Sequence, residues 1–224
     1  MPKFYVVATP IGNLKDITLR AIEILKSVDV VFAEDTRVAR KLLSHFDISK
    51  PIESFHKYSP ERVANRVAIL LGEDKNIALI TDAGTPGISD PGYYIVKKIT
   101  EAGFGDTVVA IPGPSSLAAI ISASDIDLSQ FVFFGFPPHK KGRKTMFERI
   151  AKSDVPAILF ESPHRIQKTL RELETACGDR YINAGRELTK VYEEVFRGTL
   201  LEAQKYFAGE KERGEFVLVI DVMI

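Results

Sequence analysis

The chain has 224 residues, 45% hydrophobic and 27% charged, and its 30 Lys and Arg residues balance its 30 Asp and Glu residues. This composition is typical of a folded globular protein and argues against a disordered chain. The neutral balance also argues against a protein that coats nucleic acid through bulk charge. Cys177 is the single cysteine, which excludes an intrachain disulfide and a cysteine-based zinc site.

The sequence predicts a cytoplasmic protein without a membrane segment. Its N-terminus has no signal-peptide pattern, and no apolar run approaches the roughly 20 residues that span a bilayer. Its cysteine usage is typical of a reducing compartment.

The charges are not spread evenly. Residues 67–130 hold 3 basic and 8 acidic residues, a net charge of −5, whereas residues 131–152 hold 6 basic and 1 acidic residue, a net charge of +5. A short basic segment therefore follows an acidic one, and such an asymmetry is a hint about binding partners.

The first half alternates short apolar runs with helical patterns. Strands are predicted over 4–8, 28–33, 77–81 and 108–111. Helices are predicted over 18–26, 38–45, 60–71 and 91–101. Two helix starts carry a capping residue before a proline, at Ser59-Pro60 and Asp90-Pro91. Continuous apolar strands separated by helices predict a mostly parallel α/β sheet.

A small, polar stretch at 121–131 predicts a break, after which the pattern restarts. Strands are predicted over 131–134, 157–160, 181–184 and 216–222, and helices over 144–152 and 163–177. We therefore expect two α/β domains, an N-terminal one over 1–120 and a C-terminal one over 121–224.

Three loops rich in glycine and proline each follow a predicted strand of the first half. They are TPIGN (9–13), DAGTPGISDPG (82–92) and PGPSS (112–116). Ligands of open α/β sheets bind beyond the carboxyl ends of strands, so three such loops predict a ligand cleft. The alternative is that these residues only mark tight turns. No standard phosphate-binding loop is present, which disfavours a nucleotide triphosphatase.

Charged residues follow other predicted strands. In AEDTR (33–37), Asp35 or Thr36 either caps a helix or places a charge at the mouth of the cleft. His56 adds a titratable imidazole after a short strand. FESPHR (160–165) and AGRELTK (184–190) repeat the pattern in the second half, as caps or as a second cleft wall.

The basic segment reads FFGFPPHKKGRK over 133–144. Its cations Lys140, Lys141, Arg143 and Lys144 either form a solvated face or grip phosphates while the neighbouring aromatic rings stack on bases.

The ordered motifs resemble the ribosomal RNA small subunit methyltransferases, a branch of the tetrapyrrole methylase superfamily. The motifs are TPIGNLKDIT, AEDTR, DAGTPGISDPG, PGPSSL, FFGFPPHKKGRK, ESPHRI, RELTK and GEFVLVI, and they cover nearly the whole chain. The chain departs from the family pattern after His56, where it reads KYSPE.

The resemblance implies an S-adenosylmethionine-dependent enzyme, usually a homodimer, with its cofactor in a cleft between two α/β domains. The implied reaction is 2′-O-methylation of a decoding-centre cytidine in 16S rRNA of the small ribosomal subunit. Carried over by motif, the implied contacts to the cofactor are Pro10, Gly12, Asp82, Gly84, Thr85, Pro86, Ile88, Ser115, Ser116, Glu161, Ser162, Ala184, Phe216 and Val217.

An activated methyl group needs no metal, so the enzyme has to align the reacting atoms and manage one proton. Candidates beside the ribose hydroxyl are Asp35, His56 and Glu187, with Arg37 and Lys190 positioning phosphate. Two alternatives stay open: a tetrapyrrole C-methyltransferase of the same superfamily, and a non-catalytic RNA-binding assembly factor.

Overall fold

The computed structural model describes residues 1–55 and 60–222. It divides into two compact units, Met1–Ser115 and Ser116–Ile224, called here the first and the second unit. The division lies before the expected boundary at 120/121, because helix α5 (Ser116–Ala123) packs against β10 (Phe216–Ile220) of the second unit.

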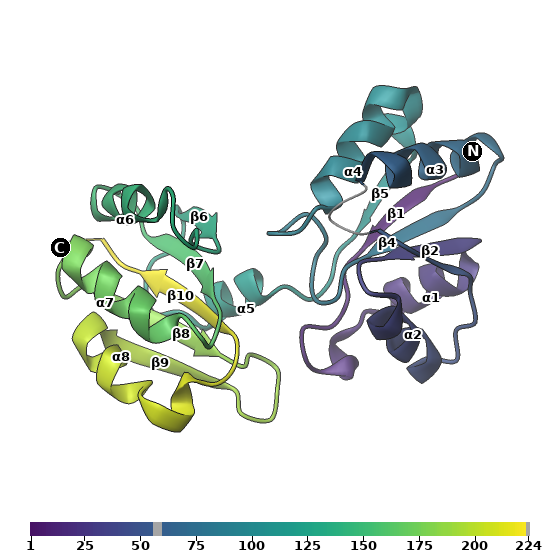
Figure 1. The fold of residues 1–224 in the computed structure, drawn as a ribbon. Helices are drawn as coiled ribbons and strands as arrows, with labels where there is room; N and C mark the ends of the chain where they lie inside the picture. The colour runs from purple at the N-terminus through teal and green to yellow at the C-terminus, as the bar shows by residue number, and fades with distance from the viewer. Residues whose placement is uncertain (56–59, 223–224) are drawn as a thin grey trace. The chain divides into compact units, whose positions relative to one another are not determined.

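The first unit is built on a five-stranded sheet (Figure 1). In spatial order its strands are β3 (Ile52–Ser54), β2 (Val30–Ala33), β4 (Ile77–Ile80), β1 (Phe4–Val7) and β5 (Val108–Ile111). All four pairings are parallel, with Phe4 opposite both Ile77 and Val108. The parallel sheet expected for the first half is therefore present, and the carboxyl ends of its strands lie at the same edge of the sheet.

Helices cover both faces of this sheet. On one face, α1 (Leu19–Ser27) and α2 (Thr36–His45) pack side chains such as Leu25 and Leu43 onto the strands. On the other face, α3 (Pro60–Gly72) and α4 (Gly92–Ile99) do so with residues such as Leu71 and Ile95. Short helical turns lie at Leu14–Asp16 (η1), Thr100–Phe104 (η2) and Gly105–Thr107 (η3).

The expected cap of α4 takes a different form. The helix begins at Gly92 with Pro91 as its N-cap residue, which makes no side-chain capping bond. Asp90 instead accepts hydrogen bonds from the N–H groups of Gly87 and Gly92, so its carboxylate closes the preceding loop as well as the helix start. The other expected cap, at Ser59, lies outside the described residues.

The second unit also has a five-stranded sheet, in the order β6 (Val132–Gly135), β7 (Ala157–Glu161), β10, β8 (Tyr181–Arg186) and β9 (Glu194–Thr199). Only β6 and β7 pair in parallel among the strands described, and the other three pairings are antiparallel. The mostly parallel pattern therefore holds for the first unit alone.

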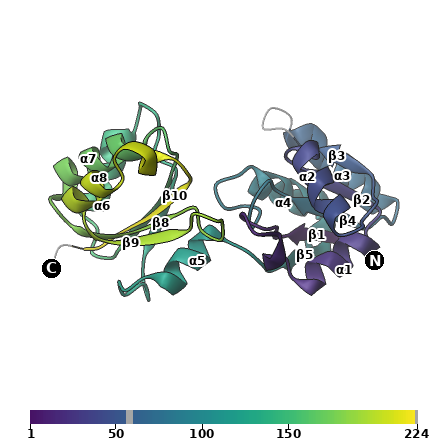
Figure 2. The same ribbon diagram turned by 90° about the horizontal axis from the view of Figure 1, so that it is seen from below.

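Helices α6 (Arg143–Ala151), α7 (Ile166–Cys177) and α8 (Leu200–Tyr206) pack on one face of this second sheet. Helix α5 lies on the opposite face (Figure 2), where a Cβ placed on Gly185 would lie 2.9 Å from Ile120 Cδ1. A short turn at Gly209–Glu212 (η4) precedes β10. No helix of the described residues combines the length and apolar character that crossing a membrane requires.

Candidate functional site

The three strand-end loops of the first unit are joined by hydrogen bonds. Thr9 N–H donates to the Gly84 carbonyl at 2.9 Å, and Gly84 N–H donates to the Thr9 carbonyl at 3.0 Å. The Thr85 hydroxyl donates to the Pro114 carbonyl at 3.0 Å. The loops after β1, β4 and β5 therefore form one cluster at the carboxyl edge of the sheet.

Gly84 is required where these loops meet. Its φ of +82° lies in the left-handed region, and a Cβ there would lie 3.2 Å from Ile11 Cγ2. Glycine alone takes this conformation without strain and leaves room for the neighbouring loop. A larger residue at position 84 would therefore strain the backbone and press on the loop after β1.

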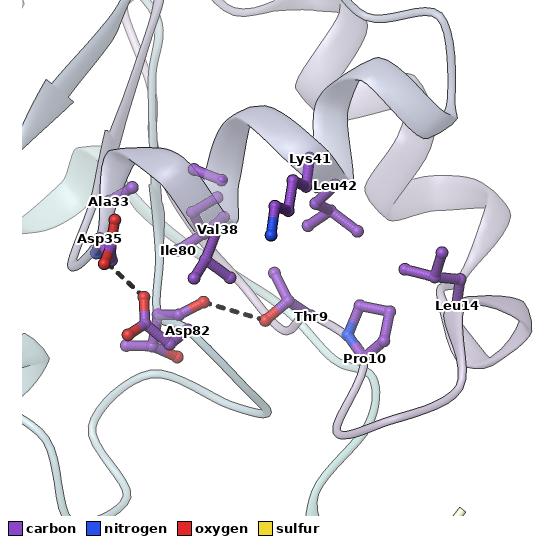
Figure 3. Close-up of a pocket in the computed structure, with 12 residues that line it drawn as sticks. Thr9, Pro10, Leu14, Ala33, Asp35, Val38, Lys41, Leu42, Ile80 and Asp82 are labelled. Atoms are coloured by element: carbon purple, nitrogen blue, oxygen red, sulfur yellow. Dashed lines mark hydrogen bonds between the residues drawn. The ribbon is translucent and has the colours of Figure 1, made fainter. Parts of the chain in front are cut away.

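A cavity of about 170 Å³ opens beside this cluster, beyond the carboxyl ends of β1, β2 and β4 (Figure 3). It is lined by Thr9, Pro10, Leu14, Ala33, Asp35, Val38, Ala39, Lys41, Leu42, Ile80, Thr81 and Asp82. Most of these side chains are apolar, and the exceptions are two carboxylates, one ammonium group and the hydroxyl-bearing Thr9 and Thr81. Small-molecule sites in proteins commonly have this composition.

The two carboxylates of the cavity are linked through the backbone. Asp35 is the N-cap of α2, and its N–H donates to Asp82 Oδ1 at 2.9 Å. Its carboxylate accepts the Arg37 N–H at 2.7 Å and the Arg37 guanidinium at 2.6 Å. The hydrogen bond from the Arg37 side chain holds the pKa of Asp35 well below its usual range. Asp35 therefore caps α2 and also lines the cavity, so the two interpretations of this residue hold together.

The residues carried over for the cofactor lie at several places in the first unit. Pro10 and Asp82 line the cavity, and Gly84 and Thr85 hold the loops together. Gly12, Pro86 and Ile88 lie within the same loops, as does Ser115, and Ser116 is the first residue of α5 in the second unit.

In the second unit, Glu161 is the centre of a buried polar network. Its carboxylate accepts hydrogen bonds from the Thr169 hydroxyl at 2.6 Å and the Ser162 N–H at 2.7 Å, and it pairs with Arg165 at 2.8 Å. The structure therefore buries Glu161 inside the second unit, where its carboxylate oxygens accept hydrogen bonds from residues of the same unit.

Arg143 belongs to this network as well. Its side chain is buried and donates to Glu172 at 2.6 Å, to Thr169 at 2.6 Å and to the Pro138 carbonyl at 3.2 Å. The guanidinium is therefore not among the exposed cations of the basic segment. Its burial was not apparent in the sequence, because Thr169 and Glu172 lie more than 20 positions further along the chain.

Glu187 and Lys190 form an ion pair at the end of β8. Lys190 Nζ lies 2.8 Å from Glu187 Oε1 and 3.0 Å from Glu215 Oε2, and the Glu215 N–H donates to Glu187. Burial raises the pKa of Glu187, but the hydrogen bonds from Lys190 and Glu215 outweigh it and leave that pKa below its ordinary value. Glu187 and Lys190 therefore pair with each other in this structure, and their roles as a base and as a phosphate-binding cation stay predictions.

This ion pair predicts a strong requirement for glycine at position 214. Gly214 has φ +105°, and a Cβ there would lie 2.5 Å from Glu187 Cγ. Replacement of Gly214 by alanine should lower the free energy of unfolding by about 2–4 kcal/mol, from backbone strain together with steric overlap. Urea denaturation is the measurement.

Gly209→Ala is the matched control, because Gly209 also has a positive φ (+70°) but nothing within 4 Å of the added Cβ. It should cost only the strain, about 1–2 kcal/mol. Equal losses in the two variants would show that the contact with Glu187 is relieved without cost.

Other residues carried over to the second unit lie in its sheet. Ala184 and Phe216 belong to the hydrophobic core, whereas Val217 alternates to the opposite face of β10. Ser162 follows β7, and its hydroxyl accepts from Arg165. His56 lies outside the described residues.

The remaining cations of the basic segment are exposed. Lys140, Lys141 and Lys144 all reach solvent, and Lys140 and Lys144 line a second cavity of about 620 Å³ between α6 and α7. Lys168 and His139 also line it and were not singled out from the sequence. Glu148 and Glu172 line the cavity as well, each 3.8 Å from Lys144 and Lys168 respectively. Lys168 thus adds a cation of α7 next to the basic segment, on a surface that also carries two carboxylates.

Comparison with known proteins agrees with this architecture. The family model described as Tetrapyrrole (Corrin/Porphyrin) Methylases matches residues 3–204. Among solved structures, the chain resembles diphthine synthase, with a TM-score of 0.75 and 16% identity over 99% of this chain and 90% of that one. It also resembles uroporphyrin-III-C-methyltransferase from Thermus thermophilus, with a TM-score of 0.68 and 17% identity over 99% and 94%. At these identities the likeness shows the fold.

Curated relatives are much more similar in sequence. Ribosomal RNA small subunit methyltransferase I of Thermotoga maritima is 40% identical over 98% of this chain and 98% of its own length. The protein of the same name from Bacillus subtilis is 44% identical over 97% of this chain and 74% of its own length. The motifs, the two α/β units and these matches agree: the chain belongs to the tetrapyrrole (corrin/porphyrin) methylase family.

Proposed function

We propose that this chain transfers a methyl group from S-adenosylmethionine to the ribose 2′-hydroxyl of a decoding-centre cytidine in 16S rRNA. The observation that carries the proposal is the near-full-length similarity, 39–44% identity, to proteins named ribosomal RNA small subunit methyltransferase I. Methyltransferases of this family use S-adenosylmethionine, and the chain is an S-adenosylmethionine-dependent methyltransferase.

The loop cluster of the first unit fits such a cofactor. The loops over 9–13, 82–92 and 112–116 contain Asp82 and Asp90 and no Lys, Arg or His. An acidic edge with fixed backbone carbonyls favours a cationic ligand. When bound there, S-adenosylmethionine supplies a methyl group that is already activated by its positive sulfur. We propose that Pro10 and the backbone of the loop from Asp82 to Ile88 hold its methionine end.

The chain's own residues then have two tasks, to hold the ribose oxygen in line and to accept its proton. Asp35 lines the cavity beside the loop cluster, but a carboxylate with so low a pKa is a weak proton acceptor. We therefore propose that Asp35 accepts hydrogen bonds from the substrate and does not remove the ribose proton.

The exposed lysines 140, 141 and 144 and the neighbouring Lys168 favour an RNA substrate. Ammonium groups on one surface are suited to the phosphate backbone, and phosphate contacts fix the position of the enzyme on the RNA. The homodimer and the cytoplasmic location expected from the sequence stay predictions.

The test is methyl transfer from labelled S-adenosylmethionine to small ribosomal subunits of a strain that lacks the modification. We expect label in 16S rRNA, and nuclease digestion should recover it as a 2′-O-methylated cytidine. Label on a base would contradict the ribose assignment. Transfer to a tetrapyrrole but not to RNA would favour the C-methyltransferase alternative, and RNA binding without cofactor binding would favour the assembly factor.

A further inference from the structure

The cavity of the first unit has the size of one aromatic ring. An apolar protein cavity of about 150 Å³ binds benzene, and this one measures about 170 Å³. Its walls include Val38, Leu42 and Ile80, whose apolar surfaces are suited to the faces of a flat ring. A single pyrimidine ring fits this volume, whereas the fused rings of a purine are larger.

The charged groups of the cavity lie in two places. Figure 3 shows Asp35 and Asp82 together at one end, and Lys41 of α2 beyond Val38, with its side chain directed toward Thr9. Arg37 engages both oxygens of Asp35. Asp82 is exposed, and its Oδ1 accepts the Asp35 N–H. Because an ionised carboxylate has about four acceptor positions, Asp82 can accept further hydrogen bonds.

These acceptors distinguish the two pyrimidines of RNA. Cytosine presents an exocyclic amino group as a donor, and Asp or Glu carboxylates accept from it. The corresponding position of uracil is a carbonyl oxygen, which a carboxylate repels. Lys41 only donates hydrogen bonds, and both pyrimidines carry a ring carbonyl that accepts them, so Lys41 holds either base without choosing between them.

We propose that this cavity receives the base of the target nucleotide, flipped out of its stack, and that Asp82 selects cytosine over uracil through the exocyclic amino group. Taking a base out of the stack costs a few kcal/mol, and a fitted pocket with hydrogen bonds to the base edge recovers that cost. The inference rests on the proposed function and adds to it the determinant of base choice.

The test compares small subunits that are reconstituted with cytidine, uridine or adenosine at the methylated position. Single-turnover transfer from labelled S-adenosylmethionine should be about 5- to 150-fold faster on cytidine than on uridine, the range that one good base contact gives. Adenosine should react more slowly than either pyrimidine, because of its size.

Asp82→Asn should reduce the cytidine preference to within about 3-fold, because an amide both donates and accepts. The ratio of the two rates is the decisive readout, since a role of Asp82 in holding the cofactor would lower both rates together. Asp106→Asn is the matched control. Asp106 is exposed and precedes β5, at the sheet edge opposite the cavity, and this variant should keep the wild-type ratio.

The outcomes separate the inference from the proposed function. Equal wild-type rates on cytidine and uridine would overturn the base selection while leaving the methylation intact. An unchanged ratio in Asp82→Asn would overturn the role of that carboxylate, and adenosine reacting as fast as cytidine would overturn the single-ring cavity. Absence of transfer to every substrate would contradict the proposed function itself.

Discussion

Replacement of Glu161 by alanine should lower the free energy of unfolding of the second unit by about 3–5 kcal/mol, the cost of breaking a buried ion pair from one side. The Glu161 side chain is fully buried, and it pairs with Arg165 at 2.8 Å and lies 3.8 Å from Arg143. Without this carboxylate, the largely buried Arg165 guanidinium loses its anionic partner, and the Thr169 hydroxyl loses its acceptor.

Urea denaturation monitored by hydrogen exchange of the amides in β7 and β10 measures this loss in the unit concerned. Glu148→Ala is the control on the same unit, because the Lys144–Glu148 pair is exposed and separated by 3.8 Å. Removal of such a surface pair should cost less than about 1 kcal/mol.

The same variant decides between two roles for Glu161. The family resemblance implies a contact with the adenosine, whereas its hydrogen bonds in the structure all go to its own unit. If Glu161→Ala kept its stability within about 1 kcal/mol and instead weakened binding of S-adenosylmethionine, the cofactor role would stand and the network would be incidental.

The sequence predicted the α/β class and most of the first unit, because four of its five strands are continuous apolar runs bounded by turn residues, with β3 (IES) the exception. Helix α5 was missed since its sequence SLAAIISA lacks the polar face that marks a helix. Strand β9 is a partly exposed edge strand and has no apolar run. Helix α8 did carry a signal, the capping box of Thr199 and Glu202.

The candidate site was predictable in part. The positions of the three loops after strands placed them at one sheet edge, which the structure shows. The cleft at this edge was predicted, but its lining was not, because Val38 and Lys41 come from a helix without a motif and meet the loop residues only in the folded unit. The burial of Arg143 was not predictable for the same reason. A cation within a basic run is expected to be exposed, and its partners Thr169 and Glu172 on α7 are known only from the structure.

The basic segment should set the salt dependence of RNA binding. Combined replacement of Lys140, Lys141 and Lys144 by alanine should lower the slope of log affinity against log salt by about 2.1–2.7, at about 0.7–0.9 for each lost phosphate contact. The advantage of the wild type over the variant should therefore shrink by roughly 15- to 40-fold between 50 and 200 mM salt. Filter binding to 16S rRNA across that range measures both slopes.

Two controls separate phosphate contact from net charge and from folding. Removal of three exposed lysines of the first unit, Lys26, Lys75 and Lys97, changes the net charge equally and should leave the slope nearly unchanged. Arg143→Met should also leave the slope unchanged, because its guanidinium is buried against Glu172 and Thr169, and should instead lower stability. A reduced slope in Arg143→Met would place that residue on the RNA after all, and equal slopes in the two triple variants would remove the basic segment from the RNA interface.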